Sequence, residues 1–166
     1  MIKVLNDSVV YMDVDCIVNA ANTSLAGGGG VDGAIHDAAG QDLYKACAEI
    51  GYCATGDAVI TPGFNLKAKY IIHTVGPIYT YSEKNECERL LKSCYISSLN
   101  LAKTNNIHSI AFPGISTGVY GYPLNEAVSI AVSSVKQWLD NNRDYDLDVY
   151  FCCFAKSEYS EYKKFI

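Results

Sequence analysis

The apolar residues of this chain fall into short runs that are separated by polar and glycine-rich stretches. Runs rich in β-branched residues are typical of strands, and most of these are apolar on both faces, as buried strands are. They predict strands at 2–5, 16–20, 57–61, 70–75, 109–113 and 148–154. The pattern therefore indicates a sheet that is covered on both sides.

Helical periodicity occupies most of the sequence between these runs. It predicts helices from 31 to about 50, from 83 to 105, from 124 to 142, and a short one after Ser157. In the third helix, Ala127, Ala131, Val135 and Trp138 recur at the spacing of one helical face. Strands that alternate with helices predict an α/β layer structure, and no linker or repeat interrupts it. We expect one domain over residues 1–166.

Composition and charge narrow the class of protein. The 166 residues are 49% hydrophobic and 19% charged, which is typical of a globular domain that folds alone. The net charge of −5 and the scattered basic residues argue against sequence-independent binding of nucleic acid. A small anion stays possible as a ligand, because backbone N–H groups can hold phosphate without a cation.

The cysteines and the first residues bear on location and metals. The start of the sequence has no apolar signal segment, and no long apolar run predicts a membrane span. We expect a cytoplasmic protein with reduced thiols. Seven cysteines are present, but none forms a C-x-x-C pair or lies at zinc-ligand spacing from His36, His73 or His108, so we expect no metal site.

A glycine-rich loop follows the second predicted strand. Four consecutive glycines, 27–30, lead into a helix start. Consecutive glycines cost backbone entropy and need a geometric reason, such as close approach of a ligand. A helix N-terminus offers free N–H groups and a positive dipole end, which suit a phosphate or diphosphate. The alternative is a flexible turn without a ligand.

The same glycines match the dinucleotide fingerprint G-x-G-x-x-G at Gly28, Gly30 and Gly33, so a nicotinamide oxidoreductase has to be considered. In that motif the glycines follow the strand at once, and an acidic residue lies about 20 residues further on. Here residues 21–27 intervene, and Tyr52 stands where the acid would be. The context does not fit this class of enzyme.

Asn22 and Asp32 flank the glycine-rich loop. Each has a structural explanation, since Asn is common in turns and a carboxylate is stabilised in the first turn of a helix. Together, an amide and a carboxylate beside a phosphate cradle could hold a sugar hydroxyl and a water. A second loop, 113–123, also joins a strand to a helix. Its Gly118 and Gly121 allow close approach, and its Ser116 and Thr117 groups can donate hydrogen bonds.

Four segments taken together resemble the macrodomain family, and in particular its MacroD-type branch of ADP-ribosyl hydrolases and O-acetyl-ADP-ribose deacetylases. These segments are IVNAAN (17–22), GGGGVDGAIH (27–36), IHTVGP (72–77) and STGVYGYP (116–123). The likeness extends from Ile2 to about Tyr162. It implies a three-layer α/β/α fold with a central mixed sheet, a cleft for ADP-ribose, and no cofactor.

The resemblance also implies roles for individual residues. Asp7 would accept the adenine amino group, the backbone at Ser8 and Val9 would frame the base, and Phe154 would stack on it. The two loops would enclose the diphosphate and the ribose through Gly30, Val31, Asp32, Ser116, Thr117, Gly118, Val119 and Tyr120. Asn22 and Asp32 match the family's catalytic pair. His73 is interpreted as a strand residue that supports the core.

Two positions depart from the family pattern. The usual Gly-Asp-Ile-Thr near the adenine reads Asn6-Asp7-Ser8-Val9, which exchanges an apolar contact for a hydroxyl and predicts weaker binding of the base. The position after His36 is commonly basic in relatives but is Asp37 here, which predicts a different approach of a protein substrate.

These observations predict a hydrolase for esters on the distal ribose of ADP-ribose. The substrates would be proteins that carry ADP-ribose on Asp or Glu side chains, or O-acetyl-ADP-ribose. The sequence leaves open whether water attacks the anomeric or the acyl carbon. The alternative function is a module that binds ADP-ribose and releases it unchanged. The pair Asn22 and Asp32 favours the enzyme, because binding alone has less use for that carboxylate. Binding of RNA or poly(ADP-ribose) is disfavoured by the acidic charge and by the single short cleft that we expect.

Overall fold

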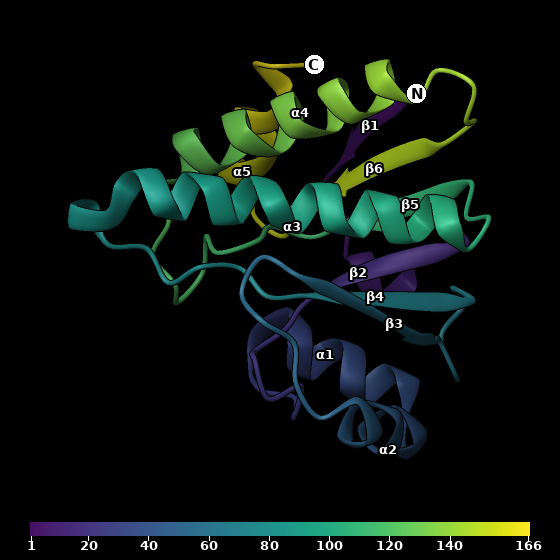
Figure 1. The fold of residues 1–166 in the computed structure, drawn as a ribbon. Coiled ribbons are helices and arrows are strands. Elements are labelled where there is room, and N and C mark those ends of the chain that lie inside the picture. Colours follow the sequence, from purple (N-terminus) through teal and green to yellow (C-terminus); the bar gives the residue numbers. More distant parts are fainter.

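The structure, a computed structural model that describes all of residues 1–166, is built around one mixed sheet (Figure 1). Its six strands lie in the order β1-β6-β5-β2-β4-β3, and only β3 runs antiparallel to its neighbour. Their bounds are Ile2–Leu5 (β1), Cys16–Ala20 (β2), Ala58–Pro62 (β3), Tyr70–Thr74 (β4), Ser109–Phe112 (β5) and Asp148–Cys152 (β6). All six lie where the hydrophobic runs predict strands.

Helices cover both faces of this sheet (Figure 1). One face packs against α1 and α2, and the other packs against α3, α4 and α5. Their bounds are Gly30–Ala39 (α1), Gln41–Ile50 (α2), Lys84–Thr104 (α3), Leu124–Asn141 (α4) and Lys156–Lys163 (α5), with short 3-10 turns at Val9–Tyr11 and Tyr81–Glu83. The predicted α/β/α layers are therefore confirmed. None of these helices is both long and apolar enough to cross a membrane.

The alternation of side chains along the strands creates two separate cores. In β2, Cys16 and Val18 face the α3–α4 layer, whereas Ile17 faces the α1–α2 layer. Because both sets are apolar, the strand is buried on both faces, which explains why its sequence shows a continuous apolar run. The seven cysteines are all buried and none is in a disulfide.

The helix predicted from 31 to about 50 is in fact two helices, and that prediction is wrong. Gly40 interrupts it with φ of 96° and ψ of −177°, a backbone conformation that is almost confined to glycine. Its N–H still caps α1 by donating to the carbonyl of His36 at 3.0 Å. The apolar periodicity continues across the break, so the pattern alone does not reveal it.

Substitution of Gly40 tests this break. A Cβ there would lie 2.8 Å from Nδ2 of Asn65, in addition to the strained backbone angle. We expect Gly40→Ala to lower the free energy of unfolding by about 3 kcal/mol in a urea titration. Gly51→Ala is the matched control, because Gly51 also has a positive φ (81°) but more space, with its nearest neighbour at 3.7 Å. It should cost only about 1 kcal/mol. Equal losses would contradict the steric explanation.

Candidate functional site

The candidate site is a cleft at the carboxyl ends of the adjacent parallel strands β2 and β5. The chain leaves β2 toward α1 on one face of the sheet and leaves β5 toward α4 on the other face. Neighbouring strands whose connections diverge in this way open a crevice between two loops, and ligands of α/β proteins bind in such crevices. The loops here are 21–29 and 113–123.

Two adjoining chambers form the cleft. The Phe154 chamber, which Phe154 borders, has a volume of about 450 Å³, and the Asp32 chamber, which Asp32 borders, has one of about 430 Å³. Four residues line both: Gly30, Val31, Gly114 and Gly118. The start of α1 and the second loop therefore lie where the chambers meet.

Every residue that the sequence analysis assigns to ligand binding lines at least one chamber. Those of the Phe154 chamber are Asp7, Ser8, Val9, Gly30, Val31, Thr117, Gly118 and Phe154. Those of the Asp32 chamber are Asn22, Gly30, Val31, Asp32, Ser116, Gly118, Val119 and Tyr120. The fold thus brings residues from both ends of the chain together, while the contact that each makes with a ligand stays a prediction.

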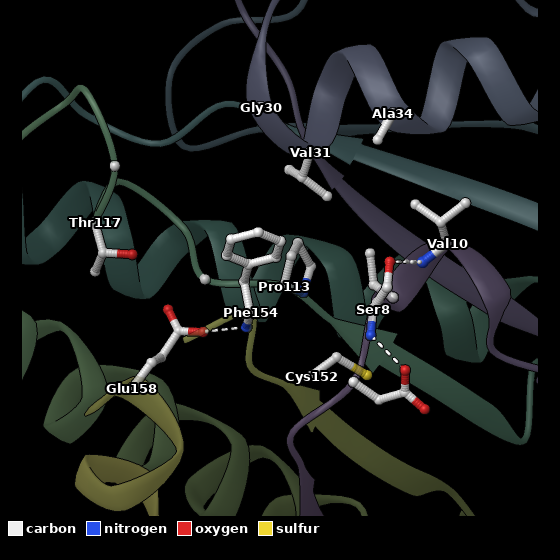
Figure 2. A pocket seen from close by; sticks show the side chains of 14 residues that line it. Ser8, Val10, Gly30, Val31, Ala34, Pro113, Thr117, Cys152, Phe154 and Glu158 are labelled. Carbon is white, nitrogen blue, oxygen red and sulfur yellow. Dashed lines mark hydrogen bonds between the residues drawn. The ribbon is translucent and has the colours of Figure 1, made fainter. Parts of the chain in front are cut away.

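Phe154 lies at the edge of its chamber, just beyond the end of β6 (Figure 2). Its side chain is 96% exposed, so a whole aromatic face is available to a flat ligand. The backbone on this side is held by short polar contacts. Asp7 accepts the N–H of Ser8 at 2.8 Å, and Glu158 accepts the N–H of Phe154 at 3.2 Å.

No lysine or arginine lines either chamber. An anionic ligand would therefore depend on backbone N–H groups. The first turn of α1 provides such N–H groups. Its N-cap residue, Gly29, has no side chain that could accept hydrogen bonds from them. Gly33 is the first residue of the helix whose N–H donates to a backbone carbonyl, that of Gly29, so the N–H groups before it are free for a ligand. The positive end of the helix dipole adds to the attraction.

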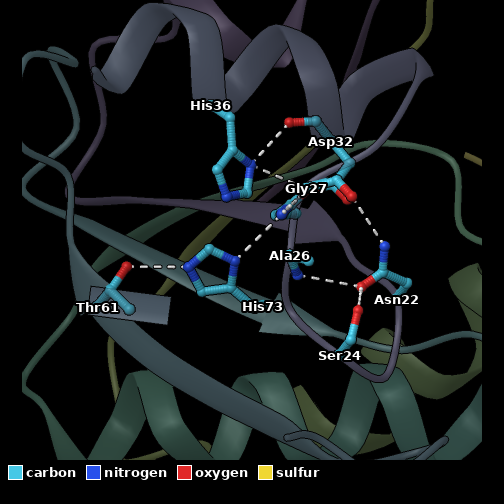
Figure 3. Close-up of polar contacts among 9 residues, drawn as sticks. Asn22, Ser24, Ala26, Gly27, Asp32, His36, Thr61 and His73 are labelled. Carbon is cyan, nitrogen blue, oxygen red and sulfur yellow. Dashed lines mark hydrogen bonds and ion pairs between the residues drawn. The ribbon is translucent and has the colours of Figure 1, made fainter. Parts of the chain in front are cut away.

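Two buried side chains, those of Asn19 and His36, contact one oxygen of the Asp32 carboxylate. Figure 3 shows His36 beside Asp32. Oδ1 of Asp32 accepts a hydrogen bond from Nδ2 of Asn19 at 2.8 Å and lies 3.1 Å from Nδ1 of His36. The same His36 nitrogen is 3.0 Å from the Asp32 carbonyl. Oδ2 has no such partner. A Cβ at Gly28 would lie 3.5 Å from it, so glycine leaves the space in front of this oxygen open.

Asn22 faces Asp32 across that space. Its Nδ2 donates to the carbonyl of Gly27 at 3.0 Å, and its Oδ1 accepts from Ser24 at 2.9 Å (Figure 3). The side chain therefore closes the glycine-rich loop on itself. The Gly28 Cβ position lies 3.7 Å from the same Nδ2, so Gly28 separates the amide of Asn22 from the carboxylate of Asp32.

In the second loop, the hydroxyl of Ser116 makes a contact within the protein, while the contact of Ser116 with a ligand stays a prediction. Ser116 has φ of 67°, and its Oγ is turned inward, where it donates to the carbonyl of Pro77 at 2.8 Å. A Cβ at Gly76 would lie 2.2 Å from this Oγ. The hydroxyl thus ties the loop to the segment that follows β4, and its single hydrogen is already used in this bond.

Three residues of the site were missed by the sequence analysis. Asn19 and His36 hold Asp32, and Glu158 lines the Phe154 chamber. Signals for two of them exist, because Asn19 is polar within the apolar strand CIVNA and His36 follows Asp32 at helical i,i+4 spacing. Glu158 had no such signal. No cluster of His, Cys, Asp or Glu is arranged to hold a metal ion.

The family model described as Macro domain matches residues 18–131, which is more than half of the chain. This chain belongs to the Macro domain family. Among solved structures, the macrodomain of Oceanobacillus iheyensis with ADP has a TM-score of 0.92 and 44% identity over 97% of this chain and 87% of that one. This likeness confirms the predicted macrodomain fold.

Two curated relatives of this macrodomain differ in how much of their length it matches. A macro domain-containing protein of Chlorobaculum tepidum is 49% identical over 99% of this chain and 94% of its own length. The ADP-ribose glycohydrolase MACROD2 of Xenopus laevis is 52% identical over 94% of this chain, which spans only 37% of that protein.

The pKa of Glu158 gives a test of the Phe154 chamber. Burial raises this pKa above its ordinary 4.5, which outweighs the lowering by the Phe154 N–H. A carboxyl group whose pKa is higher in the folded than in the unfolded state lowers the free energy of unfolding at neutral pH, where it is ionised. This loss of stability disappears as the pH falls to the pKa of the unfolded state. We expect Glu158→Gln to raise the thermal midpoint at pH 7 but not at pH 4.5. Glu161→Gln is the control. A loss of stability at pH 7 would contradict this account.

Proposed function

We propose that this macrodomain binds ADP-ribose across both chambers and hydrolyses esters of its distal ribose. The observation that carries the proposal is the carboxylate of Asp32, which is anchored through Oδ1 and leaves Oδ2 facing open space beside Asn22. Such a group can activate one water. The names of the relatives support the activity, since MACROD2 is an ADP-ribose glycohydrolase, and the Oceanobacillus macrodomain was solved with ADP.

The division of the cleft suggests how the ligand lies. The adenine occupies the Phe154 chamber, where Phe154 offers a ring face and Asp7 an acceptor for the amino group. The diphosphate lies at the start of α1, which borders both chambers. The distal ribose then enters the Asp32 chamber. Chambers of this size are in the range of about 300–1,000 Å³ that small-molecule sites occupy.

Ester hydrolysis suits a site with few titratable groups. In our proposal, Oδ2 of Asp32 takes a proton from a water as the water oxygen bonds to the carbon that is attacked. Attack at the anomeric carbon breaks its bond to the carboxylate, which leaves as an anion. Attack at the acyl carbon breaks the acyl C–O bond, and the departing ribose oxygen takes the proton back from Asp32. Asn22 orients the ribose. When the anomeric carbon is attacked, the carboxylate is a good leaving group, so one positioned base suffices and contributes about 10²- to 10⁴-fold. Both protein-linked ADP-ribose on Asp or Glu and O-acetyl-ADP-ribose are esters of this kind.

The proposal is tested with free O-acetyl-ADP-ribose, so that contacts to a protein substrate do not enter. We expect Asp32→Asn and Asn22→Ala to lower kcat by about 10²-fold or more, while calorimetry shows ADP-ribose still bound within about tenfold of the wild-type Kd. Asp37→Asn is the matched control, because Asp37 is an exposed carboxylate of the same helix. It should turn over normally.

The second arm uses a protein that is mono-ADP-ribosylated on acidic side chains, and it follows release of the modification. Tight binding of ADP-ribose by the wild type, with no turnover of either ester, would overturn the hydrolase and leave a binding module. Normal turnover by Asp32→Asn would instead remove Asp32 from the mechanism.

A further inference from the structure

A row of hydrogen-bonded, buried polar side chains extends from Asp32 through three neighbouring strands. Figure 3 shows two of its members, His73 and Thr61, in contact. Asn19 in β2 pairs in register with His73 in β4, and Thr61 follows in β3. Asn19 and His73 are fully buried and Thr61 is 3% exposed. Buried polar groups cost free energy unless they are hydrogen-bonded, and apolar side chains would pack here without that cost. The row therefore calls for a reason beyond packing.

The hydrogen bonds of this row have only one consistent direction. The carboxylate of Asp32 can only accept, so the amide of Asn19 must present Nδ2 to it. The second hydrogen of Nδ2 then points to Nδ1 of His73 at 3.1 Å, which makes that nitrogen an acceptor.

The remaining proton of His73 follows from this. Burial and, to a smaller extent, His36 lower the pKa of His73 to about 3, so its ring is neutral and carries one N–H. That N–H is Nε2–H, which donates to Oγ1 of Thr61 at 2.9 Å. The hydroxyl of Thr61 in turn donates to the carbonyl of Pro62 at 3.1 Å.

We infer that Thr61, His73 and Asn19 are positioning residues, which together select the amide orientation of Asn19 that anchors Asp32. The inference rests on the proposed function of Asp32 as the base. An amide has nearly the same shape in its two orientations, so its neighbours decide between them. The Oδ1 of Asn19 is buried without a partner, and it therefore contributes no hydrogen bond of its own to that choice.

Loss of the Thr61 hydroxyl reverses the amide orientation of Asn19. Without an acceptor, the His73 proton moves from Nε2 to Nδ1 and points at Asn19. The amide then turns its Oδ1 toward this N–H and, on the other side, toward the carboxylate of Asp32, which repels it. Asp32 keeps its contact with His36 but loses the hydrogen bond that Asn19 donates to Oδ1.

Thr61→Val tests the role of this row, because valine keeps the shape of threonine and removes only the hydroxyl. We expect kcat on O-acetyl-ADP-ribose to fall by about 3- to 10-fold, the worth of one ordinary hydrogen bond, with the Kd for ADP-ribose unchanged. Thr61→Ser should restore kcat. Thr74→Val is the matched control, since Thr74 is fully buried and its hydroxyl donates to the carbonyl of Asp57 at 2.7 Å, outside the row. Wild-type kcat in Thr61→Val, or equal losses in both valine variants, would overturn the inference.

NMR of the imidazole nitrogens gives a readout that does not depend on turnover. We expect His73 to carry its proton on Nε2 in the wild type and in Thr61→Ser, and on Nδ1 in Thr61→Val. A proton on Nδ1 in the wild type would overturn the stated direction of the hydrogen bonds, and with it the inference, even if the enzyme is active. If the wild type hydrolyses neither ester, the proposed function fails, and the proton position alone decides whether the hydrogen-bonded row has the stated direction.

Discussion

The anchoring of one oxygen of the Asp32 carboxylate is the interaction on which the site depends. A buried carboxylate is unfavourable unless other groups replace the water that it loses. Here Asn19 donates a hydrogen bond to one oxygen, and Nδ1 of His36 lies 3.1 Å from the same oxygen. The other oxygen is left to the cleft. The arrangement requires β2 and α1 to keep a fixed distance, because Asn19 and His36 come from different elements. The packing of α1 on the sheet is thus part of the chemistry as well as of the fold.

A second constraint is that an acidic protein has to hold an anion. The net charge is −5, and the cleft contains no basic side chain. Binding therefore relies on geometry, namely a helix N-terminus without a side-chain cap and glycines that let a ligand reach the backbone. Gly28 serves the same purpose at the reacting end, where any side chain would occupy the space between Asn22 and Asp32.

Much of this could be predicted from the sequence, because strand positions and the two loops are recorded in local patterns. The break at Gly40 was missed, since apolar periodicity continues across it and only the backbone angle ends the helix. The inward turn of Ser116 depends on Pro77, which is far away in sequence, and the role of Glu158 depends on how α5 packs. Such contacts are set by tertiary structure. The hydrogen bond from Asn19 to Asp32 also joins two elements. The sequence marks Asn19 as a polar residue in an apolar strand, but its partner is set by how α1 packs on the sheet.

The most direct test of the central claim is a crystal structure of the Asp32→Ala variant with ADP-ribose. The account predicts the adenine against Phe154, the diphosphate at the N–H groups of residues 30–32, and the distal ribose beside Asn22, at the place that Oδ2 would face. Adenine bound in the Asp32 chamber, or a distal ribose that points away from Asn22 into solvent, would contradict it.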